Sequence, residues 1–428
     1  MEQLMLVEFR VENFRSLRDE QVLSLVASSD KTLRDTHTIA TGLNAAPQVL
    51  RSAVIYGANA SGKSNLIKAL QYMKAVVVES ATVVQPGQTY AVQPFRLDRQ
   101  SEREPTSFEV TFILDGVRYQ YGFALTPLRI VREYLLVYKA FKPQRWFERR
   151  VDDEGNEAYT FGPGLKGAKS LWETATRSNA LFLSMAVQLN SEALRPVFDW
   201  FARRLVIFNE QAQVGLQTSF QMLQQPTAHR RICDFLSAAD ISIADIDIQT
   251  RKVQGPSVHI DMAAGKTEVK MEETEEFQLR FHHETERGAA DLDLMDESNG
   301  TRVLLHFAGP VLDILDKGLT LFIDELDTSL HTLLVRKLVG LFHQREINTK
   351  NAQLVFTTHD TSLLDATGLF RRDQVWLVKK AQDQASQLIG LAEFSPRKTE
   401  ALERGYLLGR YGGVPFLDHA LGLKANGA

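Results

Sequence analysis

The sequence predicts an α/β fold built on a largely parallel sheet, for two reasons. Residues 53–56 form a short apolar run that leads into a glycine-bounded loop at 57–64 and then a helical pattern at 65–70. From residue 292 onward, helical patterns alternate with short apolar runs of strand length. Strands that alternate with helices are typical of parallel α/β sheets.

The first part of the chain is dominated by the alternating polar and apolar residues of half-buried strands. The expected elements are an antiparallel strand pair at 6–14 and 20–26, a loop at 30–48, a hairpin at 107–125 turning at Asp115-Gly116, and further β structure at 130–161 with a turn at 152–155. The hairpin is the clearest of these, because an Asp-Gly pair between apolar runs favours a two-residue turn.

The second part is predicted to change from helices to β-ribbons and then to alternating elements. The expected elements are helical structure at 169–204, a helix at 228–240, polar β-ribbons at 241–280 around Ala264-Gly265, helices at 302–316 and 330–344, and buried strands at 319–323, 353–357 and 374–379.

Composition limits the possible partners. The chain has 428 residues, which is enough for two or three domains or one large domain with insertions. Hydrophobic residues make up 44% and charged residues 24%, as in ordinary globular proteins. The formal net charge of −4 gives no global basic field that would attract nucleic acid or anionic lipid.

The sequence also indicates the cellular compartment of the protein. Cys233 is the only cysteine and has the apolar neighbours Ile232 and Phe235, so we expect a core residue, with no disulfide within the chain. The N-terminus has no signal-peptide pattern, and no run approaches the roughly 18 apolar residues of a membrane span. We therefore expect a cytoplasmic protein without a membrane partner.

The loop at 57–64 fits the phosphate-binding pattern G-x-x-x-x-G-K-[ST] at every fixed position. Its glycines let the backbone wrap around phosphate, and its N–H groups and the following helix N-terminus face the anion. Lys63 would reach the β- and γ-phosphates, and the Ser64 hydroxyl would ligate Mg²⁺. The predicted nucleotide contacts are Gly57, Asn59, Ala60, Ser61, Gly62, Lys63, Ser64 and Asn65.

A second nucleotide motif lies at 319–325, where an apolar strand ends in two carboxylates. Asp324 would hold Mg²⁺, and Glu325 would act as general base toward the attacking water. A strand-end histidine, His359, follows the apolar run at 354–356. We predict Lys63 and Glu325 as catalytic residues and ATP with Mg²⁺ as the cofactors.

The order of these motifs resembles that of the ATP-binding cassette class of ATPases, including its RecF- and SMC-like branch. The resemblance implies that Asp327 lies in a D-loop, that His359 is a third catalytic residue that contacts the γ-phosphate, and that two chains enclose two ATP molecules. The signature turn of the class is matched by Ser298 and Gly300, although the usual Leu-Ser-Gly-Gly-Gln form is absent. Gln93 is the candidate Q-loop glutamine, with Gln88 close by.

The interval between Ser64 and Ser298 shows no sustained heptads, so β-ribbons and helices replace the long coiled coil of SMC proteins. We therefore expect an α/β P-loop ATPase head of the RecF/SMC-like cassette type with an inserted helical and β-ribbon region. The predicted parts are a first ATPase lobe at 1–100, the insertion at 101–290, and a second ATPase lobe at 291–428.

The chain as a whole is similar to the RloA/AbiL-type ATPases of bacterial phage defence. The matching segments lie at 56–64, 297–302, 324–331, 372–376 and 405–416. The resemblance implies a homodimer, or a higher oligomer of dimers, that senses infection through a trigger such as a phage protein. It also implies a separate effector, a Toprim-like or RloB-like nuclease or toxin, because no further acidic metal cluster follows Asp360.

Three other functions are open from sequence alone. The first is a RecF/SMC-like DNA repair or maintenance ATPase, which would be distinguished by bound nucleic acid. The second is an ATP-gated scaffold with negligible turnover, and the third is a transporter subunit. The sequence also leaves three roles for the tail at 404–416: it can dock a partner, close the nucleotide site or simply pack as a loop.

Overall fold

A computed structural model describes residues 4–139, 142–152, 154–208, 216–237, 243–261, 266–328, 330–395 and 400–413. The chain separates into two units. The larger unit contains the described parts of 1–211, 314–328 and 335–428, and the smaller unit those of 212–313 and 329–334.

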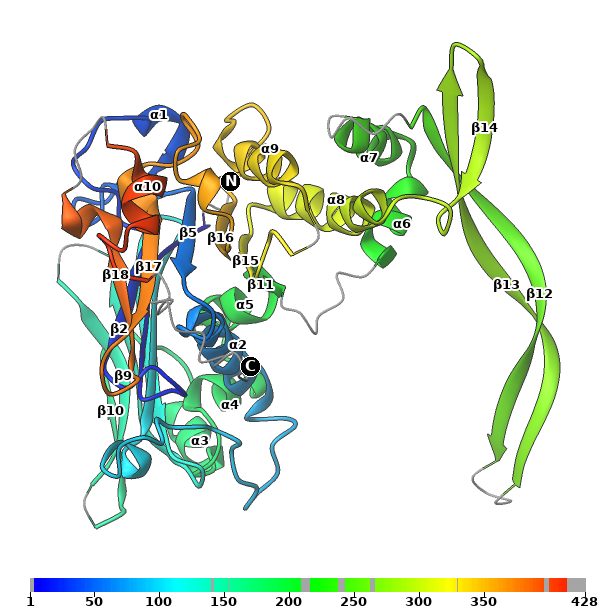
Figure 1. The fold of residues 1–428 in the computed structure, drawn as a ribbon. Helices are drawn as coiled ribbons and strands as arrows, with labels where there is room; N and C mark the ends of the chain where they lie inside the picture. Colours follow the sequence, from blue (N-terminus) through cyan, green and yellow to red (C-terminus); the bar gives the residue numbers. More distant parts are fainter. Residues whose placement is uncertain are drawn as a thin grey trace, which may run out of the picture. The chain divides into compact units, whose positions relative to one another are not determined.

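The sheet predicted from the alternating elements is a six-stranded sheet in the larger unit, with the order β11-β15-β16-β5-β17-β18. Its first five strands are parallel, and β18 pairs antiparallel with β17 at one edge. In chain order the strands are β5 (Ser52–Gly57), β11 (Leu205–Phe208), β15 (Thr320–Ile323), β16 (Gln353–Thr357), β17 (Val375–Lys380) and β18 (Ser386–Gly390). The parallel α/β fold class is thereby confirmed, and β5, β15 and β16 end at one edge of the sheet (Figure 1).

A second, antiparallel sheet of seven strands belongs to the same unit, with the order β10-β9-β8-β7-β6-β1-β2. The strands are β1 (Leu4–Glu12), β2 (Gln21–Ser24), β6 (Thr106–Leu114), β7 (Val117–Leu125), β8 (Ile130–Tyr138), β9 (Gln144–Val151) and β10 (Glu157–Phe161). The first strand pair is confirmed, and so is the hairpin turn. Asp115 and Gly116 have φ angles of 50° and 74°, as a turn with two left-handed residues requires.

Helix α2 (Lys63–Glu79) packs on both sheets, because it contacts β1 and β6 of one and β5 of the other. Its buried residues Leu66, Leu70 and Met73 belong to the same apolar core as Phe9 and Phe108 of the antiparallel sheet. The helix that follows the phosphate-binding loop is therefore held rigidly on two sides.

The side chain of Gln353, at the start of β16, joins the two sheets by hydrogen bonds. Its Oε1 accepts from the backbone N of Leu6 at 2.5 Å, and its Nε2 donates to the carbonyls of Leu6 at 3.1 Å and Leu50 at 2.9 Å. The Leu6 backbone groups are available because the pairing of β1 with β6 is irregular between Leu6 and Glu8. A buried amide thus satisfies backbone groups that the ladder leaves unpaired.

The helical structure expected at 169–204 is interrupted rather than continuous. It consists of α3 (Lys169–Ala175), α4 (Phe182–Gln188), α5 (Arg195–Asp199) and a π-helical turn η2 (Trp200–Arg204). The break between α3 and α4 has a physical reason. The buried Arg149 guanidinium donates to the carbonyls of Arg177, Ser178 and Ala180 at 3.2, 3.3 and 2.6 Å. These carbonyls point toward the buried guanidinium, and the Ser178 carbonyl also accepts from the backbone N of Ile130 at 2.9 Å, so the segment between α3 and α4 is held in a non-helical course.

The smaller unit contains the predicted β-ribbon and helix, and Figure 1 shows the ribbon as two long twisted strands. Its elements are α6 (Leu216–Leu223), α7 (Pro226–Ser237), β12 (Asp245–Asp261), β13 (Lys266–Thr285), β14 (Gly288–Asp293) and residues 299–313 of α8 (Asn299–Lys317). The expected turn at Ala264-Gly265 and the end of the helix expected at 228–240 lie outside the described residues.

Several short elements differ from the prediction. Residues 30–48 are not simply a loop, because α1 (Arg34–His37) and β3 (Thr38–Ala40) lie there and β3 pairs with β4 (Gln48–Leu50). The strands β11 and β18 and the helix α6 were not predicted, since so few residues carry little periodicity.

The remaining short elements complete the larger unit. They are α9 (Thr332–His343, whose first turn belongs to the smaller unit), α10 (Leu402–Leu407) and the 3-10 turns η1 (Ser101–Arg103), η3 (Thr361–Leu363), η4 (Arg372–Gln374) and η5 (Leu391–Phe394). Among the helices that the structure describes, none combines the length and apolar character needed to cross a membrane.

Two histidines are stacked in the core of the larger unit. The rings of His37 and His343 lie 3.8 Å apart between centroids. His343 Nε2 lies 2.9 Å from the Ser52 hydroxyl, and His37 Nε2 lies 3.1 Å from the Leu369 carbonyl. Burial lowers the pKa of His37 and lowers that of His343 far below its ordinary value, so both rings are neutral at pH 7.

This histidine pair makes folding stability depend on pH. An unfolded histidine takes up a proton near pH 6.5, whereas the folded pair resists protonation. The unfolded state therefore binds more protons as the pH falls below about 6.5, and the stabilisation present above that pH is progressively lost. We predict that His343→Gln flattens the decline in the free energy of unfolding between about pH 7 and pH 5, measured by urea denaturation. An identical pH slope in wild type and variant would contradict this assignment.

Candidate functional site

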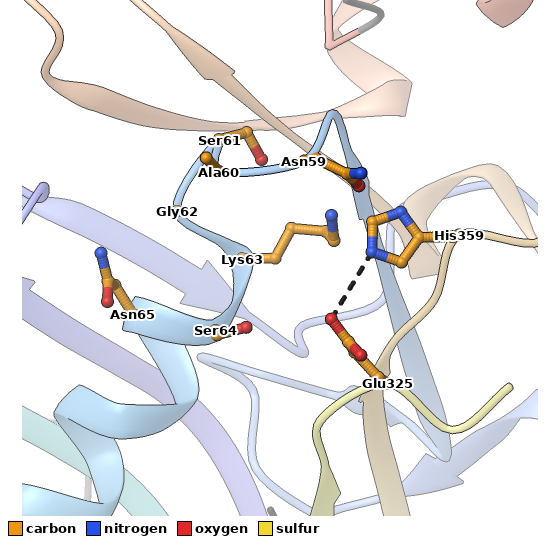
Figure 2. A pocket seen from close by; sticks show the side chains of 9 residues that line it. All are labelled: Asn59, Ala60, Ser61, Gly62, Lys63, Ser64, Asn65, Glu325 and His359. Carbon is orange, nitrogen blue, oxygen red and sulfur yellow. Dashed lines mark ion pairs between the residues drawn. The ribbon is translucent and has the colours of Figure 1, made fainter. Parts of the chain in front are cut away.

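The larger unit contains a cavity of about 600 Å³ at the carboxyl edge of the parallel sheet. Figure 2 shows the side chains that line it. They come from the loops after β5, β15 and β16 and are Asn59, Ala60, Ser61, Gly62, Lys63, Ser64, Asn65, Glu325 and His359. The three loops meet because their strands are parallel and adjacent in the order β15-β16-β5. Crevices at the carboxyl ends of such strands are the usual ligand sites of α/β sheets.

The glycines of the phosphate-binding loop are required by its geometry. Gly62 has a φ of 111° and caps the N-terminus of α2. A Cβ at Gly62 would lie 2.2 Å from the Ser386 Oγ, and a Cβ at Gly57 would lie 2.5 Å from the Val378 carbonyl oxygen. Larger residues at either position would have to displace their neighbours, which explains why both pattern positions are glycine.

The Lys63 ammonium closes the loop into a ring. Its Nζ donates to the carbonyls of Gly57 at 2.7 Å and Ala58 at 3.2 Å. Burial lowers the pKa of Lys63, while the carboxylates of Glu325 and Asp324 act in the opposite direction. A buried cation in a loop that leads into a helix N-terminus suits a phosphate group.

The Asp324 carboxylate connects the phosphate-binding loop with the two other strand ends. Its Oδ1 accepts from the Ser64 hydroxyl at 3.1 Å and from the Thr357 hydroxyl at 2.7 Å. The Thr357 Oγ1 in turn accepts from the backbone N of Glu325 at 2.7 Å. Ser64 and Asp324 thus provide adjacent oxygen donors, which is the kind of donor set that fits Mg²⁺.

Glu325 and His359 face each other across the cavity, as Figure 2 shows. Glu325 has a φ of 55°, a left-handed conformation that is uncommon outside glycine and often found at functional sites. Its Oε1 lies 3.6 Å from His359 Nε2. The backbone N of His359 donates to the Asp327 carboxylate at 3.1 Å, so Asp327 positions the histidine loop. A carboxylate and an imidazole are therefore held together beside the phosphate-binding loop.

The predicted Q-loop residues do not line this cavity. Gln93 lines a separate hollow of about 240 Å³ beside Arg15 and Phe95, and its carbonyl accepts from the Arg15 backbone N at 2.7 Å. The Oε1 of Gln88 accepts from the backbone N of Gln85 at 2.8 Å. The role of either glutamine toward a nucleotide stays a prediction.

The signature candidates lie in the smaller unit. The Ser298 Oγ accepts from the backbone N of Thr301 at 3.1 Å and lies 2.8 Å from its hydroxyl, so Ser298 caps the start of α8. A Cβ added at Gly300 would meet only the Ser298 Oγ, at 3.7 Å. An exposed backbone at a helix N-terminus suits an anion, but the contact with a second chain stays a prediction.

Two serines that sequence reasoning did not single out support the phosphate-binding loop. The Ser386 hydroxyl donates to the Ser61 carbonyl, and its Oγ lies 2.8 Å from the Ser16 Oγ. The Ser16 Oγ accepts from Asn65 Nδ2 at 2.7 Å. No local pattern could have identified them, because one serine follows β1 and the other begins the unpredicted strand β18.

The described part of the tail packs beside the start of the same loop. The ring of Tyr406 lies 5.9 Å from that of Tyr56, and its hydroxyl donates to the Gly413 carbonyl at 3.1 Å. A Cβ added at Gly413 would lie 3.8 Å from the Gly57 Cα. Residues 404–413 are therefore a packed segment next to the nucleotide loop, and the rest of the tail lies outside the described residues.

This combination of a parallel sheet, a phosphate-binding loop and a strand-end carboxylate pair defines a P-loop ATPase fold. The chain belongs to the family described as "AAA domain, putative AbiEii toxin, Type IV TA system", whose model matches residues 52–365. Membership of an AAA/ABC-type ATPase family agrees with the class that the sequence predicted, while the RloA/AbiL subtype stays a prediction. No curated protein matches the sequence.

Solved structures similar to this chain include SMC and transporter ATPases. The SMC head domain from Thermotoga maritima is 14% identical, with 90% of this chain and 98% of that chain covered and a TM-score of 0.40. An SMC head bound to the C-terminal winged-helix domain of ScpA is 12% identical, with 90% and 96% covered and a TM-score of 0.39. CbiO1 from Clostridium perfringens, part of the ABC transporter complex cbiONQ, is 12% identical, with 88% and 95% covered and a TM-score of 0.31.

We predict that Ser386→Ala weakens nucleotide binding without unfolding the chain. The substitution removes the hydroxyl that supports the Ser61 carbonyl, and one hydrogen bond contributes about 1 kcal/mol, which corresponds to a roughly fivefold loss of affinity. The measurement is titration with a fluorescent ATP analogue. Ser170→Ala, at an exposed position of α3, is the matched control and should bind like wild type. Equal affinity in both variants would show that the serine pair does not support the loop.

Proposed function

We propose that this chain is an ATP-hydrolysing ATPase that dimerises around ATP and regulates a separate effector in an anti-phage, abortive-infection system. The observation that carries the ATPase part is the single cavity that unites Lys63 and Ser64 with Glu325 and His359. A loop that only bound nucleotide would not need a carboxylate base and a histidine across from it.

The residues of the cavity have distinct roles in this proposal. The loop N–H groups and Lys63 bind the phosphates, and Glu325 accepts a proton from the attacking water. His359, which lies 3.6 Å from the Glu325 carboxylate, would contact the γ-phosphate, as the resemblance to cassette ATPases implies. Ser64 and Asp324 would hold Mg²⁺, which supplies charge neutralisation on the phosphate oxygens when bound.

Dimerisation is proposed because a cassette-type site is completed by the signature turn of a second copy. Ser298 and Gly300 are suited to this role, since they present a hydroxyl and an open backbone at the N-terminus of the long helix α8. Each nucleotide would then lie between Lys63 of one protomer and the signature turn of its partner. The dimer, or a higher oligomer of dimers, would open and close with ATP turnover.

The defence role is supported by the family description, which names a toxin and a type IV toxin–antitoxin system. In this proposal a Toprim-like or RloB-like nuclease or toxin is the effector, and a phage product is the trigger.

Coexpression of this chain with the products of its neighbouring genes, followed by phage challenge, tests the defence role. Protection that Lys63→Ala abolishes would support it. Growth arrest caused by this chain alone would instead assign toxicity to the chain itself. Strong stimulation of ATPase activity by DNA, without protection, would favour the DNA-maintenance alternative.

We predict that Glu325→Gln lowers the ATPase rate by at least about 100-fold, because an amide cannot accept the proton from water. The Asp324 and Ser64 oxygens remain, so ATP binding should persist and an ATP-bound dimer should accumulate in light scattering. Glu346→Gln, at an exposed glutamate after α9, is the matched control and should leave the rate unchanged. An unaltered rate in Glu325→Gln would remove Glu325 as the base.

We further predict that Ser298→Arg abolishes hydrolysis while the same chain still binds ATP. The bulky cation would disturb the site of the partner rather than the phosphate-binding loop of its own chain. Mixing this variant with Lys63→Ala should restore activity, since one composite site of the mixed dimer is then intact. If the mixture stays inactive although the two variants associate, the two-chain site is wrong.

A further inference from the structure

The smaller unit contains a group of metal-ligating side chains that the proposed ATPase does not use. They are His229 and Cys233 of α7 and Asp245 at the start of β12. His229 Nε2 lies 2.9 Å from the Ile246 carbonyl oxygen and 3.1 Å from the Asp245 Oδ1, and Cys233 Sγ lies 3.8 Å from that Asp245 oxygen. The three ligand atoms all lie within 4.8 Å of one another, so one ion could reach all of them.

The local sequence explains why these side chains meet. His229 and Cys233 are four residues apart and therefore share one face of α7. The buried Ile232 and Leu236 fix that helix in the unit. Cys233 itself is only partly buried, which corrects the expectation of a core residue. Its position beside an imidazole and a carboxylate gives the thiol a polar surrounding.

The β-ribbon offers a fourth side chain, His282, which lies outside the 4.8 Å group but is paired with one of its members. His282 of β13 is the register partner of Asp245, and directly paired residues of an antiparallel ladder share one face. Its Nδ1 lies 2.8 Å from the Asp291 Oδ1 of β14, which leaves Nε2 for another partner. A histidine held at one ring nitrogen by a carboxylate is the usual second-layer arrangement of metal-binding histidines.

The donor types indicate which ion would bind. Imidazole, thiolate and carboxylate are all ligands that tetrahedral Zn²⁺ takes, whereas Mg²⁺ and Ca²⁺ prefer oxygen alone. Zinc binds the thiolate form of cysteine, so metal binding releases the thiol proton.

We propose that His229, Cys233 and Asp245, with His282 as the fourth ligand, bind a structural Zn²⁺ ion in the smaller unit. The ion ties α7 to the base of the β-ribbon. Because the ligands come from separate elements, the free energy of metal binding adds to the stability of the unit.

Cobalt substitution tests the site in the full-length chain. Cys233 is the only cysteine, so a thiolate-to-Co²⁺ absorption band can arise only here and not from a divalent ion at Ser64 and Asp324. We expect one equivalent of Co²⁺ to produce the band and Zn²⁺ to displace it. The band should vanish in Cys233→Ser, and affinity should fall by about 10- to 100-fold in Asp291→Asn, which loosens His282. Asp234→Asn, exposed on the same helix, is the control and should retain the band.

Alkylation of the wild-type thiol provides a second readout that does not depend on a variant folding. Zn²⁺ should slow the reaction of Cys233 with iodoacetamide by at least about tenfold, because a metal-bound thiolate is no longer free. Binding of Co²⁺ without a thiolate band, or an alkylation rate that Zn²⁺ leaves unchanged, would overturn the proposal.

Discussion

The shared carboxylate of Asp324 is the interaction on which the site depends. One oxygen accepts from Ser64 at the start of α2 and from Thr357 at the end of β16. Since β16 lies between β5 and β15, Thr357 is placed to connect the strand of the phosphate-binding loop with the strand of the carboxylate pair. A shift of one residue in either parallel pairing would turn these side chains to the other face of the sheet and separate them.

The larger unit stabilises this arrangement from several sides. Helix α2 packs on both sheets, so the N–H groups at its start keep a fixed direction. The Ser386 hydroxyl donates to the loop, and the segment around Gly413 lies close to Gly57 at its start. Because these contacts are already formed in the free protein, little of the loop has to be ordered when a phosphate binds. The left-handed backbone conformation of Glu325 also indicates a preformed site, since strained residues persist only where their neighbours fix them.

The smaller unit is organised differently. Its described apolar core includes Ile232, Leu236 and Phe281, and the cluster of His229, Cys233 and Asp245 provides chemistry that an apolar core lacks. A metal or another cross-link adds to the stability of a small domain. A site of this kind would stiffen the region that also carries Ser298, whose capping of α8 is a local interaction. The metal cluster uses none of the residues that line the nucleotide cavity, so metal binding and ATP turnover can be tested separately.

The sequence by itself determined the parallel sheet, the hairpin at Asp115-Gly116, and the loops that hold Lys63, Asp324 and His359. These features have local causes, namely side-chain periodicity, turn residues and fixed spacing within one strand–loop–helix segment. Only the tertiary structure decided which distant residues support them, as with Gln353, Ser386 and the pairing of Asp245 with His282. Hydrogen bonds and register between residues far apart leave no periodic trace in the chain, and short strands such as β11 are defined by their neighbours rather than by their own residues.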